Sequence, residues 1–237
     1  MTKVATFVLS LVLSVAPAPG YAQTSQSSAP LPAAGASSAA SPAPTVYAAL
    51  VDRLRAGDRT VDVGEARMAF TATPAYSGTM MFFYRSLWGA INMRDFEGAL
   101  KIVDTVLQRN YVEPNAHMVA SLAHNELGHR EEAQLHRFIA DGLLRSITSQ
   151  GDGKTPETAY KVIDISEEYA LFRALNLTPK SQSAVPSDGG LIADRMVVVD
   201  PRTREERIMY FSVDNLQAAM RRRATQTQGT AGADAPR

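Results

Sequence analysis

The chain has 237 residues, enough for one domain or two small ones. Its 24 Lys and Arg residues balance 24 Asp and Glu residues, so it lacks the surplus positive charge that a dedicated nucleic-acid-binding protein uses to displace counterions from phosphates. Cysteine is absent, which excludes disulfides, thiol nucleophiles, iron–sulfur ligation and zinc sites with cysteine ligands.

The N-terminus has the organisation of a secretory signal peptide. Lys3 precedes an uncharged, mostly apolar run over residues 4–15, which is shorter than the roughly 20 residues of a membrane-spanning helix. Gly20 and Ala22 occupy the small-residue positions of a signal-peptidase site. We therefore expect residues 1–22 to be removed from an exported, periplasmic or secreted protein with no membrane span after cleavage.

Composition divides the remaining chain into a tether, a folded part and a tail. Residues 23–44 carry no charge and consist almost entirely of Ala, Ser, Pro and Gln, so they cannot bury enough apolar surface to offset the entropy of ordering. The segment 223–237 is interpreted as a disordered tail for the same reason. A single α+β domain is expected over 45–222, helical over 45–150 and mixed over 151–222.

Helical periodicity and capping residues dominate the first part of the domain. Apolar residues recur on one helical face between Val46 and Leu54, and Gly57 suits the end of that helix. Asp62 has the position of an N-cap for a short helix through Phe70. Four further helices are predicted over residues 79–92, 95–109, 114–127 and 130–149.

Two segments of this helical region resemble each other. Residues 94–100 align with residues 128–134 and place Ala99 and Ala133 34 positions apart, which is the tetratricopeptide period. We expect both alanines at close helix contacts, and we expect replacement of the neighbouring Gly98 by Ala to be stabilising. The alternative is an ordinary helical bundle in which this offset is coincidental.

The pattern changes after residue 150. A strand is predicted over 159–165, then a helix over 166–175 with Ser166 as its N-cap. Strand-type residues predict three more strands, with Asp200 and Pro201 in the turn between the last two. These strands are expected over residues 179–185, 191–199 and 206–213. The fold class is therefore α+β, with tetratricopeptide-like α-helical hairpins followed by a small antiparallel β-sheet.

Several segments, in this order, resemble the bacterial family called domain of unknown function 4919. They are residues 67–70, 116–120, 139–147, 151–160, 167–170 and 209–214. The segment 151–160 is the most specific of them. The resemblance covers about residues 45–214, and it implies one continuous domain in an exported bacterial protein. It implies no particular activity or substrate.

A peptide-binding groove is the first candidate site. In tetratricopeptide arrays the first helix of each hairpin lines the concave surface, so residues at helical spacing on two such helices are candidates. The candidate side chains are Tyr84, Trp88, Asn92, Met118, Leu122 and Glu126. The alternative is that they pack in the core, because aromatic residues at helical spacing usually do.

The four histidines lie within 20 residues, at positions 117, 124, 129 and 136. The pairs His117/His124 and His129/His136 are each seven residues apart, about 10 Å along a helix, too far to share one ion. In a hairpin that turns at Gly128, His136 could approach His117 or His124. We expect structural or solvated histidines, with no metal and no cofactor.

The other motifs do not indicate a catalytic or ligand-binding site. The segment 151–155 ends like a phosphate-binding loop but lacks its first glycine and its preceding strand. Adjacent glutamates at 131–132, 167–168 and 205–206 point in different directions and are expected to be solvated or to lie at helix N-termini. No GxSxG or SxxK motif supports nucleophilic serine chemistry.

The sequence therefore predicts a non-enzymatic interaction or scaffold module of the bacterial cell envelope, with a protein or peptide partner. The alternative is an enzyme with an unrecognised site where the helices meet the sheet. The residues that would form that site are Arg67, His117, His136, Asp141 and Lys154.

Overall fold

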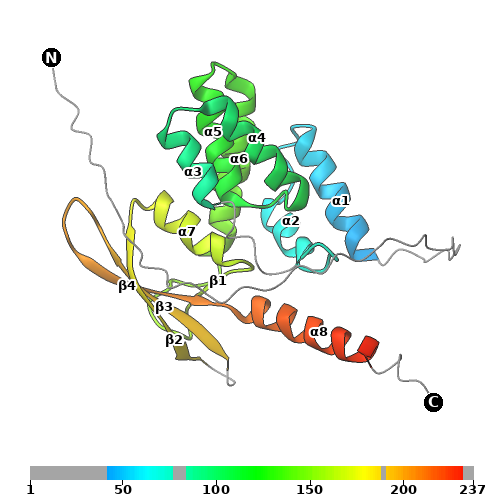
Figure 1. The fold of residues 1–237 in the computed structure, drawn as a ribbon, viewed down its shortest axis with the longest axis vertical. Helices are drawn as coiled ribbons and strands as arrows, with labels where there is room; N and C mark the ends of the chain where they lie inside the picture. Colours follow the sequence, from blue (N-terminus) through cyan, green and yellow to red (C-terminus); the bar gives the residue numbers. More distant parts are fainter. Residues whose placement is uncertain (1–41, 77–83, 188–190, 232–237) are drawn as a thin grey trace, which may run out of the picture. The chain divides into compact units, whose positions relative to one another are not determined.

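The computed structural model describes residues 42–76, 84–187 and 191–231 (Figure 1). The predicted signal peptide, most of the linker and residues 79–83 of one predicted helix lie outside these ranges. The described helices are α1 (Pro42–Arg55), α2 (Val63–Phe70), α3 (Tyr84–Asn92), α4 (Phe96–Arg109), α5 (Pro114–Glu126), α6 (Arg130–Thr148), α7 (Ile165–Ala174) and α8 (Asp214–Ala231). The strands are β1 (Tyr160–Lys161), β2 (Thr178–Pro186), β3 (Ile192–Val199) and β4 (Glu206–Ser212). Within the described ranges, no helix is both long enough and apolar enough to cross a bilayer.

Local signals place the helix starts as predicted. The Asp62 carboxylate accepts hydrogen bonds from the Gly64 and Glu65 amides at the start of α2. Asp95 accepts from the Gly98 amide at the start of α4, and Pro114 occupies the first turn of α5. The amide groups of a first helical turn lack partners within the helix. The two aspartates accept hydrogen bonds from such amides, and proline has no amide hydrogen to satisfy.

The α3–α4 and α5–α6 hairpins have the same turn. Arg94 and Gly128, 34 residues apart, both adopt left-handed backbone, with φ of 58° and 82°. In both turns the next amide, of Asp95 or His129, donates to a carbonyl five residues earlier, at 3.0 and 2.8 Å. This bond pattern is a common helix C-terminal motif. The predicted similarity of the two segments therefore corresponds to repeated backbone geometry, although glycine occupies only one of the turns.

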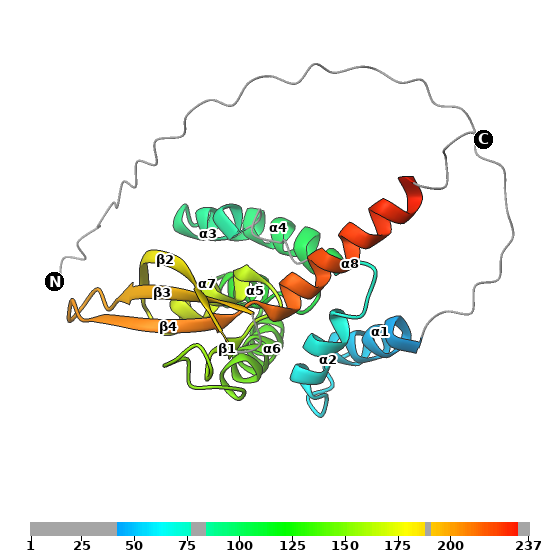
Figure 2. The same cartoon turned by 90° about the horizontal axis from the view of Figure 1, so that it is seen from below.

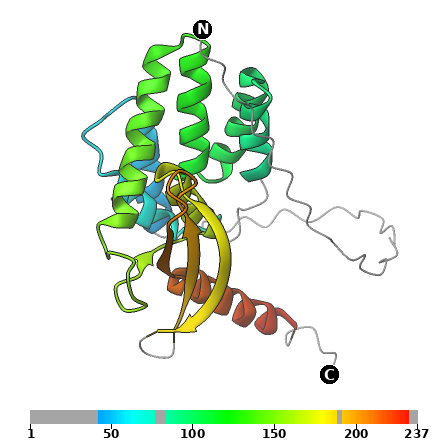
Figure 3. The ribbon, with the colours of Figure 1, turned by 90° about the vertical axis from the view of Figure 1, so that its left-hand side faces the viewer.

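The helices pack as neighbouring pairs, with α3 against α4, α4 against α5, and α5 against α6 (Figures 1 and 3). Ala99 and Ala133 are both buried, as the 34-residue offset predicts. Gly98 is less buried than Ala99, yet a Cβ built on it would lie 2.0 Å from the Asp95 carboxylate. We therefore expect Gly98→Ala to be destabilising and not stabilising, because the methyl group would displace the capping side chain.

The sheet is mixed, and the predicted purely antiparallel sheet needs correction. Its order is β1-β4-β3-β2, with β2–β3 and β3–β4 antiparallel and β1–β4 parallel (Figure 2). The strand predicted over 159–165 is reduced to two residues, Tyr160 and Lys161. It is short because the buried residues that follow lead directly into the N-cap of α7, Asp164, whose carboxylate accepts from the Ser166 amide. Ser166 itself is thus not the cap that the sequence predicts.

The predicted hairpin over 191–213 is confirmed as β3 and β4, which pair from Ala193↔Ser212 to Val199↔Glu206. Alternate residues of these strands face α7, and they include Met196 and Phe211. A second apolar cluster lies among the helices α1–α6. The domain is therefore α+β, with packed helix pairs followed by a four-stranded sheet.

Helix α8 is a feature that the sequence analysis did not predict. It follows β4 directly and continues through residues 223–231, the first part of the segment interpreted as a disordered tail. Leu216 and Ala219 are buried against the rest of the domain, and the Asn215 amide donates to the Val162 carbonyl at 3.5 Å. Because the buried contacts of α8 involve few apolar side chains, the sequence of this helix shows only a weak apolar periodicity.

Candidate functional site

A groove of about 750 Å³ lies on the helical part of the domain, and we call it the helical groove. Most of its lining residues come from α5 and α6, which pack side by side (Figure 3). Trp88 of α3 and Ala174 of α7 also line the groove. The residues from α5 and α6 are Met118, Ser121, Leu122, Asn125, Arg130, Ala133, Gln134, Arg137, Ala140, Asp141 and Leu144.

The structure brings half of the predicted groove residues together. Trp88, Met118 and Leu122 all line the helical groove. Tyr84 instead lines a separate pocket of about 320 Å³ beside Tyr169. The remaining two lie elsewhere: Asn92 is exposed, and Glu126 is paired with Arg94 at 3.3 Å.

Trp88, which lines the groove, is held by a hydrogen bond and a cation–π contact. Its indole Nε1–H donates to the buried Asn115 Oδ1 at 3.4 Å, and only 8% of the residue is exposed. The guanidinium carbon of Arg173 lies 3.8 Å from the indole ring centroid, a cation–π contact. Leu122 is 38% exposed. The groove thus combines a mostly buried aromatic anchor, as core packing would predict, with an accessible apolar side chain.

Helix α6 contributes a wall of the groove that was not predicted from the sequence. Its lining residues recur every three or four positions from Arg130 to Leu144, which is a helical stripe visible in the sequence. Among them, only Asp141 was predicted as a site residue, and that prediction was for a different site. The tetratricopeptide analogy directed attention to the first helix of each hairpin, whereas this groove also uses the second helix.

The histidines form a continuous cluster between α5 and α6. His117 Nδ1 lies 2.8 Å from His136 Nδ1, and the His136 and His124 rings stack with centroids 5.5 Å apart. His124 Nδ1 lies 3.3 Å from His129 Nδ1. A hairpin that turns at Gly128 was expected to allow His136 to approach His117 or His124, and in the structure His136 contacts both. Exposure increases along the cluster, from buried His117 to exposed His129.

Hydrogen bonding determines the tautomers at the buried end of this cluster. The Tyr111 carbonyl, 2.6 Å from His117 Nε2, can only accept, so Nε2 carries hydrogen. Nδ1 of neutral His117 then accepts, and His136 donates from its own Nδ1. Burial, followed by the charge of His136, lowers the pKa of His117 to about 3. Burial, followed by the charge of His124, lowers the pKa of His136 to about 4.

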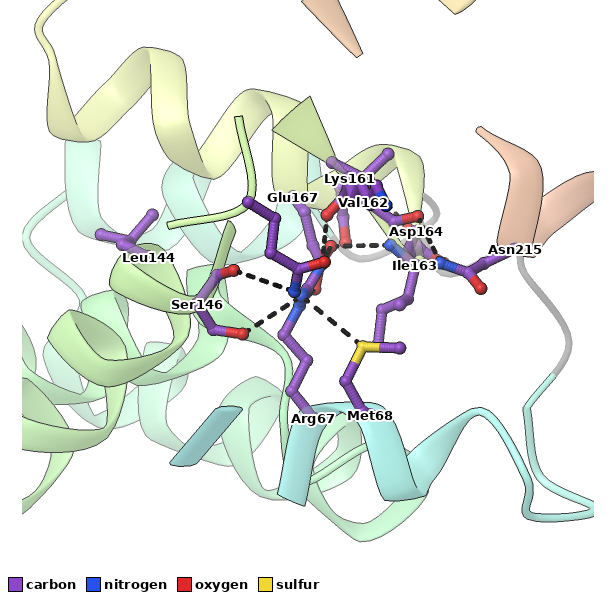
Figure 4. Close-up of polar contacts among 12 residues, drawn as sticks. Arg67, Met68, Leu144, Ser146, Lys161, Val162, Ile163, Asp164, Glu167 and Asn215 are labelled. Carbon is purple, nitrogen blue, oxygen red and sulfur yellow. Dashed lines mark hydrogen bonds and ion pairs between the residues drawn. The ribbon is translucent and has the colours of Figure 1, made fainter. Parts of the chain in front are cut away.

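A buried ion pair joins the helical part to the sheet part of the domain (Figure 4). Arg67 of α2 donates from Nε and Nη2 to the two carboxylate oxygens of Glu167 on α7, both at 2.7 Å. Nη2 also donates to the Lys161 carbonyl, and Nη1 donates to Ser146 Oγ at 3.3 Å. The Ile163 amide donates to Glu167 at 2.8 Å. Each guanidinium nitrogen of Arg67 thus donates to an acceptor from another part of the domain, so the ion pair forms a junction between α2, α6 and the segment from β1 to α7.

Other buried carboxyl groups lie near the start of α7. Neither oxygen of Glu168 has a hydrogen-bond partner of normal geometry among the described residues. Burial, followed by the negative charge of Asp194 on β3, raises the pKa of Glu168 to about 9. Burial also raises the pKa of Glu113, at the N-cap of α5, to about 7. Glu167 and Glu168 do lie in the first turn of α7, at the helix N-terminus that the sequence predicts. Neither is solvated, however, because both are buried.

The five residues of the alternative enzymatic site do not converge. His117 and His136 meet in the histidine cluster, whereas Arg67 is enclosed by its pair with Glu167. Asp141 pairs with Arg137 at the helical groove. The exposed Lys154 pairs with Asp152 at 3.1 Å. Among the described residues, no three His, Asp or Glu side chains are arranged to hold a metal ion.

Comparison with known proteins gives a family assignment. A family model described as Domain of unknown function (DUF4919) matches residues 42–222. The chain belongs to the DUF4919 family. The match begins with α1 and ends within α8, so the DUF4919 domain includes both the helical groove and the Arg67–Glu167 junction. No curated protein and no solved structure matches the chain.

Proposed function

We propose that this DUF4919 protein is an exported, non-enzymatic interaction module of the bacterial cell envelope that binds a protein or peptide partner in the helical groove. The observation that carries the proposal is the groove itself. Its volume of about 750 Å³ falls within the usual range for ligand sites. Its walls combine a fixed aromatic anchor with accessible apolar and amide groups, the composition found where proteins recognise one another.

The two hairpins support the same proposal. Their turns have the same backbone geometry at a 34-residue offset, and tetratricopeptide arrays bind peptides on stacked hairpins of this length. We propose that the hairpins of this chain are tetratricopeptide-like in this functional sense. The enzymatic alternative has less support, because its five residues are distributed over separate places in the fold.

Site-specific cross-linking tests the proposal. A photoreactive benzoylphenylalanine replaces Leu122 in the groove of the full-length protein, expressed in a bacterium that exports it. Ile208 on β4, which is similarly exposed, is the matched control position. We expect a discrete cross-linked partner from position 122 and none from position 208. Absence of any adduct at position 122, or identical adducts at both, would rule out the groove as the binding surface.

Export is tested separately. The proposal rests on Lys3, the apolar run over residues 4–15 and the small residues Gly20 and Ala22. N-terminal sequencing of the mature protein should begin at Gln23. Recovery of soluble cytoplasmic protein with an intact Met1 would contradict the predicted signal peptide.

A further inference from the structure

We infer that the helical groove selects a peptide segment in which carboxylate side chains flank an apolar residue. This inference rests on the proposed function and specifies the chemistry of its ligand. The observation behind it is an imbalance of charge at the groove. The chain as a whole has equal numbers of basic and acidic residues, so a local surplus must come from how the fold arranges them.

Two arginines line the groove, and a third lies next to it, in the neighbouring pocket that Tyr84 and Tyr169 also line. Arg130 and Arg137 of α6 line it, and Arg173 of α7 lies over the indole of Trp88. Asp141 is the one acid among the lining residues, and its carboxylate lies 3.8 Å from Arg137 Nε. Within the described part of the chain, Arg130 and Arg173 have no carboxylate partner.

The positions of these two guanidinium groups suit a carboxylate ligand. Arg173 is already oriented by its ring contact with Trp88 and by a 3.4 Å hydrogen bond to the Tyr84 hydroxyl. A guanidinium ordered in this way loses little side-chain entropy when it binds a carboxylate, and its remaining N–H groups can form a bidentate contact.

The apolar part of the ligand has its own place in the groove. Met118 and Leu122 on α5 and Leu144 on α6 provide aliphatic contacts beside Trp88. The side-chain amides of Asn125 and Gln134 also line the groove and supply donors and acceptors for a peptide backbone. A ligand with an apolar residue flanked by acids therefore meets complementary groups along the groove.

Fluorescence offers a direct test, because Trp88 is the one tryptophan in the whole sequence. The full-length mature protein is titrated with three pools of short random peptides that lack tryptophan. Each pool has a fixed central Leu, flanked by Glu in one pool, Gln in the second and Lys in the third. We expect the Glu pool to shift Trp88 emission with a half-saturation concentration about tenfold below that of the Gln pool, which corresponds to about 1.4 kcal/mol.

Variants identify the groups responsible. In R130Q/R173Q the Glu and Gln pools should become equivalent, whereas R207Q, on the exposed face of β4, should retain the preference. The comparison uses half-saturation concentrations, since removing Arg173 changes the starting emission of Trp88.

The outcomes separate this inference from the proposed function. Equal binding of the Glu and Gln pools, a preference for Lys, or a Glu preference that survives in R130Q/R173Q would overturn the acidic-peptide inference and leave groove binding intact. The same applies if no pool binds but Leu122 still cross-links a partner. Failure of both the peptide titration and the cross-linking would reject the proposed function as well.

Discussion

Arg67 and Glu167 lie 100 residues apart in the sequence and form a two-bond ion pair with both N–O distances at 2.7 Å. Both side chains are almost completely buried. The pair connects α2 to α7, and the same groups also bind the Lys161 carbonyl and the Ile163 amide. It therefore fixes the segment between β1 and α7 against the helices.

Removing one member of this pair should destabilise the protein severely. Arg67→Met leaves the Glu167 carboxylate buried without its cation, at a cost of about 3–5 kcal/mol. The double variant Arg67→Met/Glu167→Leu should recover part of that loss, because no unpaired charge remains. Urea unfolding at constant m-value measures both.

The exposed pair between Lys180 and Glu206 is the matched control for this experiment. Lys180→Met should cost less than about 1 kcal/mol, since water screens exposed ion pairs. If Arg67→Met unfolds at nearly the same urea concentration as Lys180→Met, the Arg67–Glu167 pair does not stabilise the junction.

The turn at Arg94 predicts a stabilising substitution. A non-glycine residue in left-handed backbone costs about 1–2 kcal/mol relative to glycine, and Arg94 has φ of 58°. Arg94→Gly should therefore raise the free energy of unfolding by about 1 kcal/mol, after loss of the exposed contact with Glu126. Gly128→Ala, at the equivalent turn, should lower it by a similar amount.

Glu126→Gln controls for the lost ion pair and should be almost neutral. Thermal unfolding of the three variants distinguishes the contributions. A destabilised Arg94→Gly protein together with a neutral Gly128→Ala protein would show that the two turns are not energetically equivalent.

Two glycine substitutions should have opposite effects. In α3, a Cβ on Gly89 would meet no atom within 4 Å, so Gly89→Ala should stabilise the helix by up to about 1 kcal/mol. In α4, a Cβ on Gly98 would displace the Asp95 cap, so Gly98→Ala should cost about 0.5–2 kcal/mol. Midpoint shifts in urea measure the contrast, and equal shifts would contradict the capping role of Asp95.

Enlarging the buried alanines should also destabilise the hairpins. Ala99 and Ala133 are 0% and 7% exposed, so Leu at either position overpacks a helix contact, typically by 1–3 kcal/mol. Ala72→Leu in the loop after α2 is the control, and it should be less destabilising because Ala72 is exposed. Leu variants at 99 and 133 that unfold at the parent midpoint would contradict close packing at both positions.

The histidine cluster predicts a loss of stability in acid. His117 and His136 have pKa values of about 3 and about 4 in the folded protein, below their ordinary value of 6.5. At pH values between about 3 and 6.5, the unfolded chain therefore binds more protons than the folded protein. The free energy of unfolding should fall as pH decreases from about 6.5 toward 3. His117→Gln retains a donor for the Tyr111 carbonyl and should weaken this dependence. An unchanged acid dependence in that variant would contradict the assignment.

Glu168 predicts the opposite dependence at higher pH. Its pKa of about 9 lies above the ordinary value of 4.5, so the folded protein retains a proton that the unfolded chain loses. The free energy of unfolding should fall as pH increases from about 4.5 toward 9. Glu168→Gln, which is neutral throughout, should flatten this alkaline decline. Chemical unfolding measured from pH 5 to 9 tests the prediction, and an equally steep decline in the variant would contradict it.

Local sequence signals determined most of the helical architecture. Asp62, Asp95 and Pro114 marked helix starts because each acts on amides of its own first turn. Gly128 marked the α5–α6 turn because glycine adopts left-handed backbone without a steric penalty. The 34-residue offset and half of the groove residues were likewise accessible from the sequence, since they depend on spacing along one or two helices. The family resemblance was accessible because it rests on short sequence segments in a fixed order.

Tertiary structure decided the features that depend on distant partners. Nothing local distinguishes buried Glu167 and Glu168 from solvated glutamates, because their environments come from Arg67 on α2 and Asp194 on β3. The parallel pairing of β1 with β4 likewise requires the chain to return after about 50 residues. The position of Arg173 of α7 over Trp88, next to the helical groove, also depends on how α3 and α7 pack. Periodicity describes one element at a time, whereas these contacts depend on how separate elements pack.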